Sequence, residues 1–319
     1  MQVMVFPLLF LLRLFAMLKR SQIPWLVLFL TPATVVVVMF IVAPLFASMF
    51  NSFFAWDGFV RQGFVGFENF VDIFRVYPYN EQFPNALKNN LTWFVMSMLV
   101  QNTIGIFFGY LLSRNIRGYD LYKRLFFMPV LLSIIAVGFL WKLYYNPQFG
   151  LFFSLFKNLH IEHLYHAWLG DAATATPALI VMNIWRWIGF PTLVFLAAFD
   201  NVPVDCIEGA YLEGAGAWRI FWKIQVPLVV PSFMIITVLT LIGSINVFEQ
   251  VYALAGLDGA PNYATDTLSL LFYRTAFGSQ ASTVPIVGIG SALSVIIYML
   301  CIGFSFLSIK FFQSKEVEQ

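Results

Sequence analysis

Charged residues are scarce in this chain of 319 residues, where Asp, Glu, Lys and Arg together make up only 11%. Soluble domains carry about 25% charged residues, so the composition excludes a soluble globular protein. The net charge of +2 provides no polybasic surface of the kind that binds nucleic acid. Two cysteines, Cys206 and Cys301, predict no disulfide framework.

Catalytic motifs are also missing from the sequence. It has no G-x-x-x-x-G-K-[ST] loop to hold nucleotide phosphates, so any ATP hydrolysis must come from another polypeptide. Neither H-E-x-x-H nor G-x-S-x-G occurs, and no paired carboxylates fall within apolar runs, which argues against a membrane enzyme. His160, His163 and His166 are spaced so that a surface metal site is possible, but we favour an amphipathic outer loop and expect no metal.

Apolar residues are what the chain has in abundance: 60% are hydrophobic, and the mean hydropathy is +0.81. A helix needs roughly 20 apolar residues to cross the hydrocarbon core of a bilayer. The sequence therefore predicts an all-α, multi-pass membrane protein with about six transmembrane helices. The predicted spans are Trp25–Phe50, Leu91–Ser113, Leu125–Tyr145, Pro177–Phe199, Leu228–Phe248 and Val284–Ile309.

Residues 1–24 are predicted to form an N-terminal cytoplasmic or interfacial segment, followed by a transmembrane domain over residues 25–319. Within it, Val3–Leu18 is apolar but short for a span and contains Arg13. Its positive charges lie inside and after the apolar part, unlike those of a secretory signal. We expect a helix in the membrane interface, with a seventh span as the alternative.

Lys and Arg residues predict the orientation, because they are enriched on the cytoplasmic side of membrane proteins. One side of the predicted spans holds most of them: Arg13, Lys19, Arg20, Arg114, Arg117, Lys123, Arg124, Arg219, Lys223, Lys310 and Lys315. This side should be the cytoplasm. Both termini and the polar segment Asp200–Pro231 are then cytoplasmic.

The polar segment Asp200–Pro231 separates two apolar runs and is predicted to be a helix–turn–helix. Pro203 should begin a short helix over Val204–Leu212, because proline is favoured at helix starts. Gly214 should end it, and Ala217–Gln225 should form a second helix. A membrane-embedded bundle has no packing need for this segment, so we expect something outside the membrane to dock on it.

This segment resembles the EAA loop of ABC-importer permeases, whose pattern is E-A-A, three residues, G, nine residues and I-x-L-P. The corresponding residues are Glu208-Gly209-Ala210, then Gly214, then Ile224 to Pro227, with Gly209 and Val226 as departures. Further stretches are similar to the carbohydrate-uptake branch, the maltose, multiple-sugar and glycerol-phosphate type, and specifically to its first permease subunit. They are Phe64–Phe70, Arg124–Pro129, Val137–Phe152, Ile184–Phe190, Ile242–Leu254 and Tyr273–Phe277. Gly256–Asn262 departs from the family's usual Gly-Gly-Gly-Pro turn.

The resemblance implies a type I importer permease in a bacterial or archaeal cytoplasmic membrane. It implies a second homologous permease, two ATPase subunits and an extracytoplasmic solute-binding protein as partners. No cofactor is expected in this chain, since the partner ATPases would bind ATP and Mg. The EAA loop would be the coupling helix seated on an ATPase, through Glu208, Gly209, Ala210, Glu213, Gly214, Ala215, Ile224 and Pro227.

Polar residues within the predicted spans are candidates for the substrate path, because such residues are costly in lipid and usually face a cavity or a partner. The candidates are Asn183, Trp185, Arg186, Ser244, Asn246, Glu249 and Gln250. Amides, hydroxyls and aromatic faces suit sugars. The alternatives are an aromatic belt at the membrane interface for Trp185, and a contact with a neighbouring helix for Asn246.

The function expected is therefore the import of a sugar or oligosaccharide by alternating access, driven by separate ATPases through the EAA loop. The alternative within this class is a non-sugar solute, such as an amino acid, a polyamine or a phosphate ester. A passive channel or scaffold would leave Glu208–Pro227 unexplained.

Overall fold

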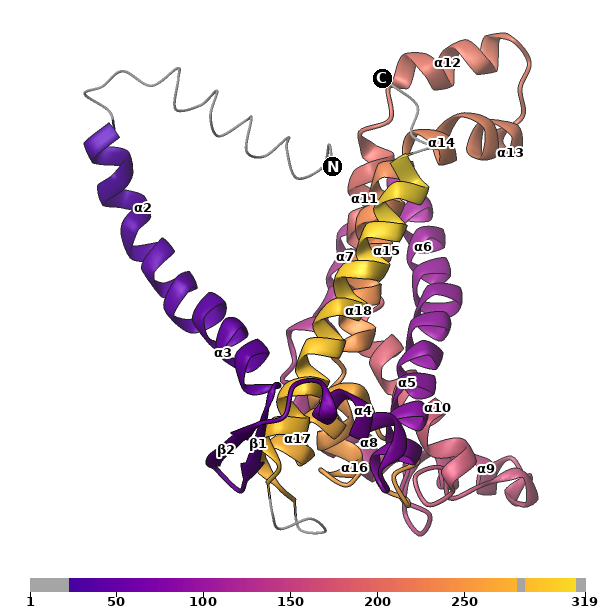
Figure 1. Cartoon of the computed structure of the whole chain (residues 1–319). Coiled ribbons are helices and arrows are strands. Elements are labelled where there is room, and N and C mark those ends of the chain that lie inside the picture. Colours follow the sequence, from indigo (N-terminus) through magenta and orange to yellow (C-terminus); the bar gives the residue numbers. More distant parts are fainter. Residues whose placement is uncertain (1–22, 280–284, 314–319) are drawn as a thin grey trace. The chain divides into compact units, whose positions relative to one another are not determined.

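The structure is a computed structural model that describes residues 23–279 and 285–313 (Figure 1). The elements it describes are helical except for one two-stranded antiparallel sheet, in agreement with the all-α prediction. The chain divides into two compact units, Met1–Asn51 and Ser52–Gln319. The predicted interfacial helix Val3–Leu18 and the basic residues Arg13, Lys19, Arg20 and Lys315 lie outside the described residues.

The first unit is a helical rod made of α2 (Ile23–Val37), the π-helical turn η1 (Val38–Val42) and α3 (Ala43–Asn51). Helix α2 has no charged residue and no polar face, so it is apolar all round, and it contains Pro32. Side chains such as Phe29 and Phe40 are exposed. A helix that is apolar all round is typical of a membrane span, as predicted for Trp25–Phe50.

The second unit begins with a short hairpin and contains all the remaining elements. In its first half these are β1 (Phe54–Asp57), β2 (Val60–Phe64), α4 (Glu68–Arg75), α5 (Tyr79–Met96), η2 (Ser97–Asn102), α6 (Thr103–Ser113), α7 (Tyr119–Phe127), η3 (Met128–Leu131), α8 (Ile134–Tyr144), α9 (Leu151–Asn158) and η4 (Glu162–Leu164). In its second half they are α10 (Ala172–Trp187), α11 (Gly189–Asp200), α12 (Val204–Leu212), α13 (Ala217–Ile220), η5 (Phe221–Gln225), α14 (Val226–Leu228), α15 (Val230–Ile245), α16 (Glu249–Ala255), α17 (Leu268–Phe277) and α18 (Val287–Gln313).

Three described helices are long and apolar enough to cross a membrane, and the number rises to six if each of three bent pairs forms one span. The run predicted as a single span over Leu125–Tyr145 differs most from expectation, because α7–η3 and α8 meet at 97°. Pro129 has no backbone N–H to donate, and the chain leaves the helical region at Leu132, whose ψ is 141°. The predicted spans Pro177–Phe199 and Leu228–Phe248 also belong to bent pairs, at 43° and 64°.

Close helix packing in the second unit depends on two glycines of the second predicted span. A Cβ on Gly109 would lie 2.8 Å from the Phe195 Cβ, and one on Gly105 would lie 2.9 Å from the Pro191 Cβ. The G-x-x-x-G face of α6 is therefore covered by α11 of the same chain. Small residues allow such close approach in membranes, and the contact aligns α6 and α11 side by side.

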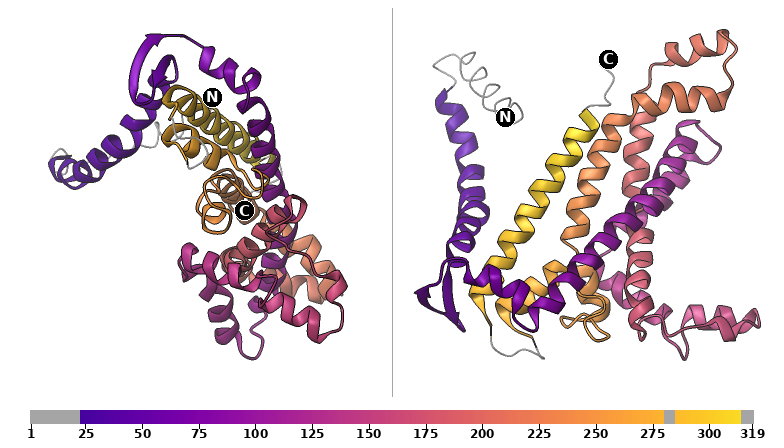
Figure 2. Two further views of the ribbon diagram at one scale, coloured as in Figure 1. Left: turned by 90° about the horizontal axis from the view of Figure 1, so that it is seen from below. Right: turned by 45° about the vertical axis from the view of Figure 1, so that its right-hand side comes forward.

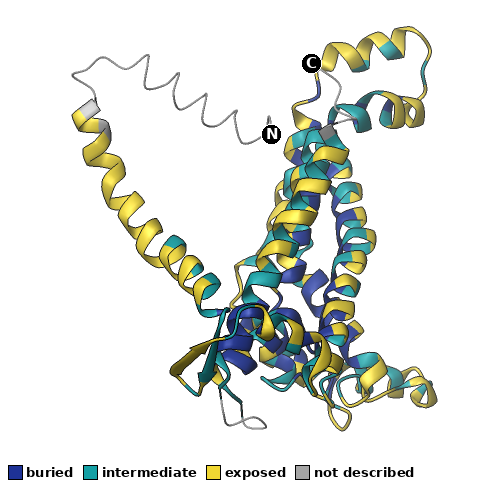
Figure 3. Ribbon diagram, viewed as in Figure 1, coloured by how far each residue is buried: buried dark blue, intermediate teal, exposed yellow. Residues whose placement is uncertain are grey.

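Within the second unit, the long helices lead from one group of short elements to another. Helix α18 runs beside α15 and also packs on α17 and α4 (Figure 2). Helices α12 and α13 project beyond one end of the long helices α6, α11 and α15. Helices α9, α16 and α17 lie at the opposite end (Figure 1). The largest cluster of buried residues lies between α5, α8, α10 and α16, around Trp93, Leu179 and Val251. A second cluster lies where α4, α5, α17 and α18 meet, while α12 is largely exposed (Figure 3).

Candidate functional site

In the EAA loop the first helix has the predicted boundaries, whereas the second continues past the predicted end at Gln225 through α14 to Leu228. Helix α12 spans Val204–Leu212 after Pro203, and α13 and η5 together span Ala217–Gln225. The turn between them is a Schellman motif, in which the Ala215 N–H donates to the Ala210 carbonyl at 2.9 Å and the Gly214 N–H donates to the Tyr211 carbonyl at 3.0 Å. Gly214 has a φ of +80°, a conformation that glycine adopts without strain.

The EAA loop exposes apolar side chains that the sequence analysis did not select. Leu212 is 90% exposed and Trp218 is 74% exposed, and Trp222 and Val204 are also exposed. Contiguous exposed apolar residues commonly mark a protein-binding surface. Tryptophan is also enriched among the residues that contribute most to binding. A signal was present in the sequence, since Trp218 and Trp222 stand four residues apart in a polar insert.

Of the eight EAA-loop positions predicted from the sequence to couple to an ATPase, four are exposed and four are partly buried. Glu208, Gly209, Glu213 and Gly214 are exposed, whereas Ala210, Ala215, Ile224 and Pro227 are partly buried. Among the described residues, Glu208 has no hydrogen-bond or ion-pair partner. Its carboxylate is therefore available to an external donor, while the apolar members of the motif are partly covered by the chain itself.

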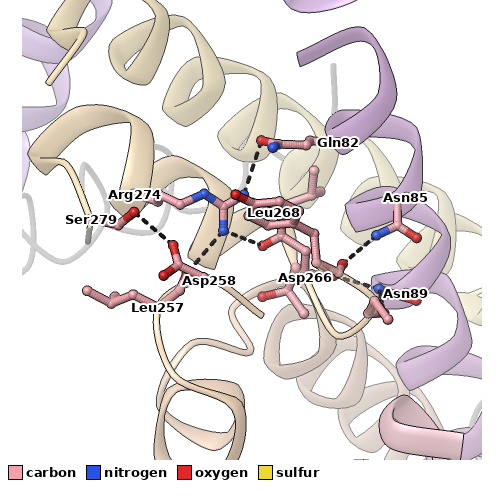
Figure 4. Close-up of polar contacts among 12 residues, drawn as sticks. Gln82, Asn85, Asn89, Leu257, Asp258, Asp266, Leu268, Arg274 and Ser279 are labelled. Atoms are coloured by element: carbon pink, nitrogen blue, oxygen red, sulfur yellow. Dashed lines mark hydrogen bonds and ion pairs between the residues drawn. The ribbon is translucent and has the colours of Figure 1, made fainter. Parts of the chain in front are cut away.

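At the opposite end of the second unit, the loop Gly256–Thr267 is held by a buried polar network (Figure 4). Arg274 forms an ion pair with Asp266 at 2.6 Å, and both side chains are buried. The same guanidinium donates to the Gln82 Oε1 at 3.1 Å and to the Leu257 carbonyl at 3.0 Å. Burial raises the pKa of Asp266, and the Arg274 guanidinium opposes that rise.

Three asparagines on α5 attach this loop and its neighbours to the helical body. Asn85 donates to the Tyr263 carbonyl at 2.7 Å, and Asn89 donates to the Asp266 carbonyl at 2.8 Å (Figure 4). Asn90 donates to the Ser244 carbonyl at the end of α15. It also accepts a hydrogen bond from the Leu268 N–H at the start of α17. Asn90 therefore forms hydrogen bonds with the ends of two helices, α15 and α17, that are far from it in the sequence.

A cavity of about 330 Å³ lies between α5, η2, α10, α11 and α15. Each element contributes polar or aromatic side chains to its wall, and none of the described lining residues is charged. The lining comprises Trp93, Ser97, Gln101, Asn102, Asn183, Trp187, Phe190, Pro191, Ile236, Leu239, Thr240, Gly243, Ser244, Asn246, Val247 and Gln250. Such a mixture of amides, hydroxyls and indoles can bind a ligand that carries both hydroxyls and apolar C–H faces.

Four of the seven predicted substrate-path residues line this cavity: Asn183, Ser244, Asn246 and Gln250. The other three lie outside its lining. Trp185 packs on Trp141 with ring centroids 5.8 Å apart, and Arg186 donates from Nε and Nη2 to the Leu132 carbonyl at 3.3 and 3.2 Å. Glu249 is exposed and interacts electrostatically with Arg186. Helical periodicity explains the split, since Asn183 and Trp187 share a helix face that excludes Trp185.

The sequence analysis missed the second-span side of the cavity. Trp93, Ser97, Gln101 and Asn102 all come from α5 and η2. The Trp93 Nε1, Gln101 Oε1 and Asn102 Oδ1 atoms are buried without a hydrogen-bond partner in the described structure. Polar residues at 97, 101 and 102 within an apolar run were the available signal, because such residues usually face a cavity or a partner.

The family model for "Binding-protein-dependent transport system inner membrane component" matches residues 101–319. A probable ABC transporter permease, YurN of Bacillus subtilis, is 30% identical over 94% of this chain and 99% of its own length. The multiple sugar-binding transport system permease MsmF of Streptococcus mutans is 28% identical, with 91% of this chain and 95% of MsmF covered. The trehalose/maltose transport system permease MalF of Thermococcus litoralis is 27% identical, with 89% and 92% covered.

A crystal structure of a bacterial ABC transporter that imports the acidic polysaccharide alginate contains a similar chain. Its TM-score is 0.77 at 23% sequence identity, over 95% of this chain and 99% of that chain. This likeness shows the permease fold. The family inferred from Glu208–Pro227 and the flanking motifs is thereby confirmed: the chain belongs to the inner membrane components of binding-protein-dependent transport systems.

Proposed function

We propose that this chain is a permease subunit of an ATP-driven importer for a sugar or oligosaccharide. The single observation that carries the proposal is the uncharged cavity of amides, hydroxyls and indoles between α5, η2, α10 and α15. Several relatives support the same proposal, among them a multiple sugar-binding transport system permease and a trehalose/maltose transport system permease. Within the cavity, Asn183, Ser244, Asn246 and Gln250 are the proposed substrate contacts from this chain.

ATP hydrolysis is assigned to separate ATPase subunits that dock on the EAA loop and bind ATP and Mg. The exposed side chains of Leu212, Trp218 and Trp222 provide an apolar surface for that contact, and the unpaired Glu208 provides a carboxylate. Rigid-body movement of the ATPases would be transmitted through α12 and α13 to α11 and α15. The membrane helices would then alternate between outward- and inward-facing states.

The remaining partners are a second homologous permease and an extracytoplasmic solute-binding protein. A structurally similar chain, 23% identical to this one, belongs to a bacterial alginate ABC transporter in complex with an alginate pentasaccharide-bound periplasmic protein. In the proposed orientation both termini and the EAA loop are cytoplasmic, within a bacterial or archaeal cytoplasmic membrane. The network around Asp266 and Arg274 then lies on the outer side, where a binding protein would dock.

The test is uptake by the complete transporter, in which this chain is co-expressed with its second permease, its ATPases and its binding protein. Proteoliposomes containing ATP should accumulate a radiolabelled saccharide against its gradient. Vesicles with a non-hydrolysable ATP analogue are the control and should accumulate none. ATP-dependent accumulation of an amino acid, a polyamine or a phosphate ester without any saccharide would contradict the proposal.

A further inference from the structure

We propose that Tyr110 couples the EAA loop directly to the long helix formed by α5, η2 and α6, so that movement of the loop reaches the cavity wall. The inference rests on the proposed function and adds a positioning residue to it. Tyr110 lies near the end of the second predicted span, where the sequence analysis selected no coupling residue.

The Tyr110 ring packs against an aromatic ring of the EAA loop and against one of α11. Its centroid lies 4.5 Å from that of Phe221 on η5, in the second helix of the loop, and 5.4 Å from that of Phe199 on α11. The centroids of Phe199 and Phe221 are 6.0 Å apart. Three rings from three elements are therefore in mutual contact, at separations that are favourable for aromatic pairs.

The first helix of the EAA loop reaches the same end of α6. Ile207 on α12 packs against the buried cluster that includes Phe199, as Tyr110 does. Arg114 follows Tyr110 by one helical turn and donates from its Nη1 to the Tyr110 hydroxyl at 3.2 Å. A weaker interaction connects the same guanidinium with the Tyr211 side chain on α12. The end of α6 is thus in contact with both helices of the loop.

These contacts are important because α6 does not adjoin the EAA loop along the chain. The loop continues directly from α11 and leads directly into α15, whereas α7 to α11 separate it from α6. Movement of the loop can therefore reach α6 only through packed elements and side chains. One such path is α11, against which Gly105 and Gly109 are closely packed. Tyr110 provides a second path, from the loop itself.

The helix that contains Tyr110 extends without interruption over Tyr79–Ser113. Its middle part lines the cavity, for example with Ser97. Its far end bears Asn89, which donates to the Asp266 carbonyl in the loop Gly256–Thr267. A displacement applied at Tyr110 is therefore carried along one helix to the cavity wall and to the opposite end of the unit.

The experiment measures the number of saccharide molecules imported per ATP hydrolysed by the complete transporter in proteoliposomes. The probe is radiolabelled maltotriose, cellotriose or mannotriose, whichever the wild type accumulates. Tyr110→Ala removes the ring and leaves the glycine contacts with α11 intact, so this ratio should fall about fivefold. Tyr110→Phe keeps the ring and should retain most of the wild-type ratio. Both variants should bind the ATPase subunits with wild-type affinity, because the exposed surface of the EAA loop is unchanged.

Phe108→Ala is the matched control on the same helix. The Phe108 ring centroid lies 4.5 Å from that of Phe126 on α7, the same separation as between Tyr110 and Phe221. Its removal takes away a comparable ring contact of α6 that does not involve the EAA loop, so the ratio should stay at the wild-type value. Phe221→Ala removes the proposed contact from the side of the loop. It should lower the ratio as Tyr110→Ala does, and it tests the contact even if Tyr110→Ala does not assemble.

A wild-type ratio in Tyr110→Ala or in Phe221→Ala would overturn the inference and leave ATP-driven import intact. An equal loss in Phe108→Ala would also overturn it, because the loss would then reflect the general packing of α6. Accumulation by the wild type of a non-sugar solute and of no saccharide would contradict the proposed function instead. The same ratio measured with that solute would still test the role of Tyr110.

Discussion

The two ends of the second unit hold their loops in opposite ways. The EAA loop is stabilised by its own backbone, through the turn at Gly214, and exposes Leu212 and Trp218. The loop Gly256–Thr267 is fixed by side chains from distant helices, including the buried Arg274. The comparison teaches that the loop Gly256–Thr267 is held by contacts within this chain, whereas the EAA loop leaves apolar side chains exposed, as expected of the proposed docking surface.

The largest effect should come from breaking the buried polar network around Asp266 and Arg274. Arg274→Met leaves the Asp266 carboxylate buried without its cation. Removing one partner of a buried ion pair costs about 3–5 kcal/mol. The free energy of unfolding in detergent, followed by tryptophan fluorescence, should fall by that amount. Arg75→Met, at an exposed arginine of α4, is the control and should change it little. Equal stability of the two variants would show that the network does not hold the loop.

A change on the EAA loop should affect binding and not folding. Trp218→Ala removes an exposed aromatic side chain, and such residues at the centre of an interface contribute about 2 kcal/mol or more. The affinity of the ATPase subunit for the permeases should fall at least tenfold in a titration, with no loss of stability. The exposed Tyr77→Ala, a variant at the other end of the unit, should bind the ATPase normally. Undiminished ATPase binding by Trp218→Ala would remove it from the docking surface.

Reversing the charge of Glu208 should impair the coupling of ATP hydrolysis to transport more than it impairs binding of the ATPase. Glu208→Lys reverses an exposed, unpartnered charge, so transport should fall about tenfold, equivalent to about 1.4 kcal/mol, while the unfolding midpoint stays unchanged. Gly214→Asp should have the same effect, since a side chain at φ +80° distorts the turn. Glu81→Lys, at an exposed position of α5, is the matched control. Normal sugar-stimulated ATP hydrolysis in both loop variants would contradict the coupling role.

The smallest effect should follow from removing a single hydrogen bond of the buried polar network around Asp266 and Arg274. Asn85→Ala deletes a single hydrogen bond to the Tyr263 carbonyl, worth about 1 kcal/mol. Its unfolding free energy should therefore lie between those of the wild type and Arg274→Met. A loss as large as that of Arg274→Met would mean that the network fails as a unit when any member is removed.

Local signals in the sequence were sufficient for the EAA loop. Pro203 and Gly214 act on their immediate neighbours, and the predicted helix Val204–Leu212 is the one observed. The bend between α7–η3 and α8 was missed because proline is tolerated in membrane helices, so Pro129 alone did not distinguish a kink from a 97° break. The roles of Asn89 and Asn90 were beyond reach, because their partners are more than 150 residues away along the chain.

The cavity shows the same limit. Ser244 and Asn246 were selected as polar residues of an apolar run and do line it. Arg186 was selected by the same rule but donates to a backbone carbonyl outside the lining. Whether a polar residue of a span faces a cavity depends on its helix face and on which helices pack there, and both are properties of the folded unit.

Hydrogen–deuterium exchange, measured on the permeases with and without their ATPase subunits, tests the central claim most directly. If the EAA loop is the docking surface, the amides of α12 and α13 should become protected on ATPase binding, while those of Gly256–Thr267 keep the same exchange rates. Unchanged exchange in α12 and α13 with the ATPase fully bound would contradict the account.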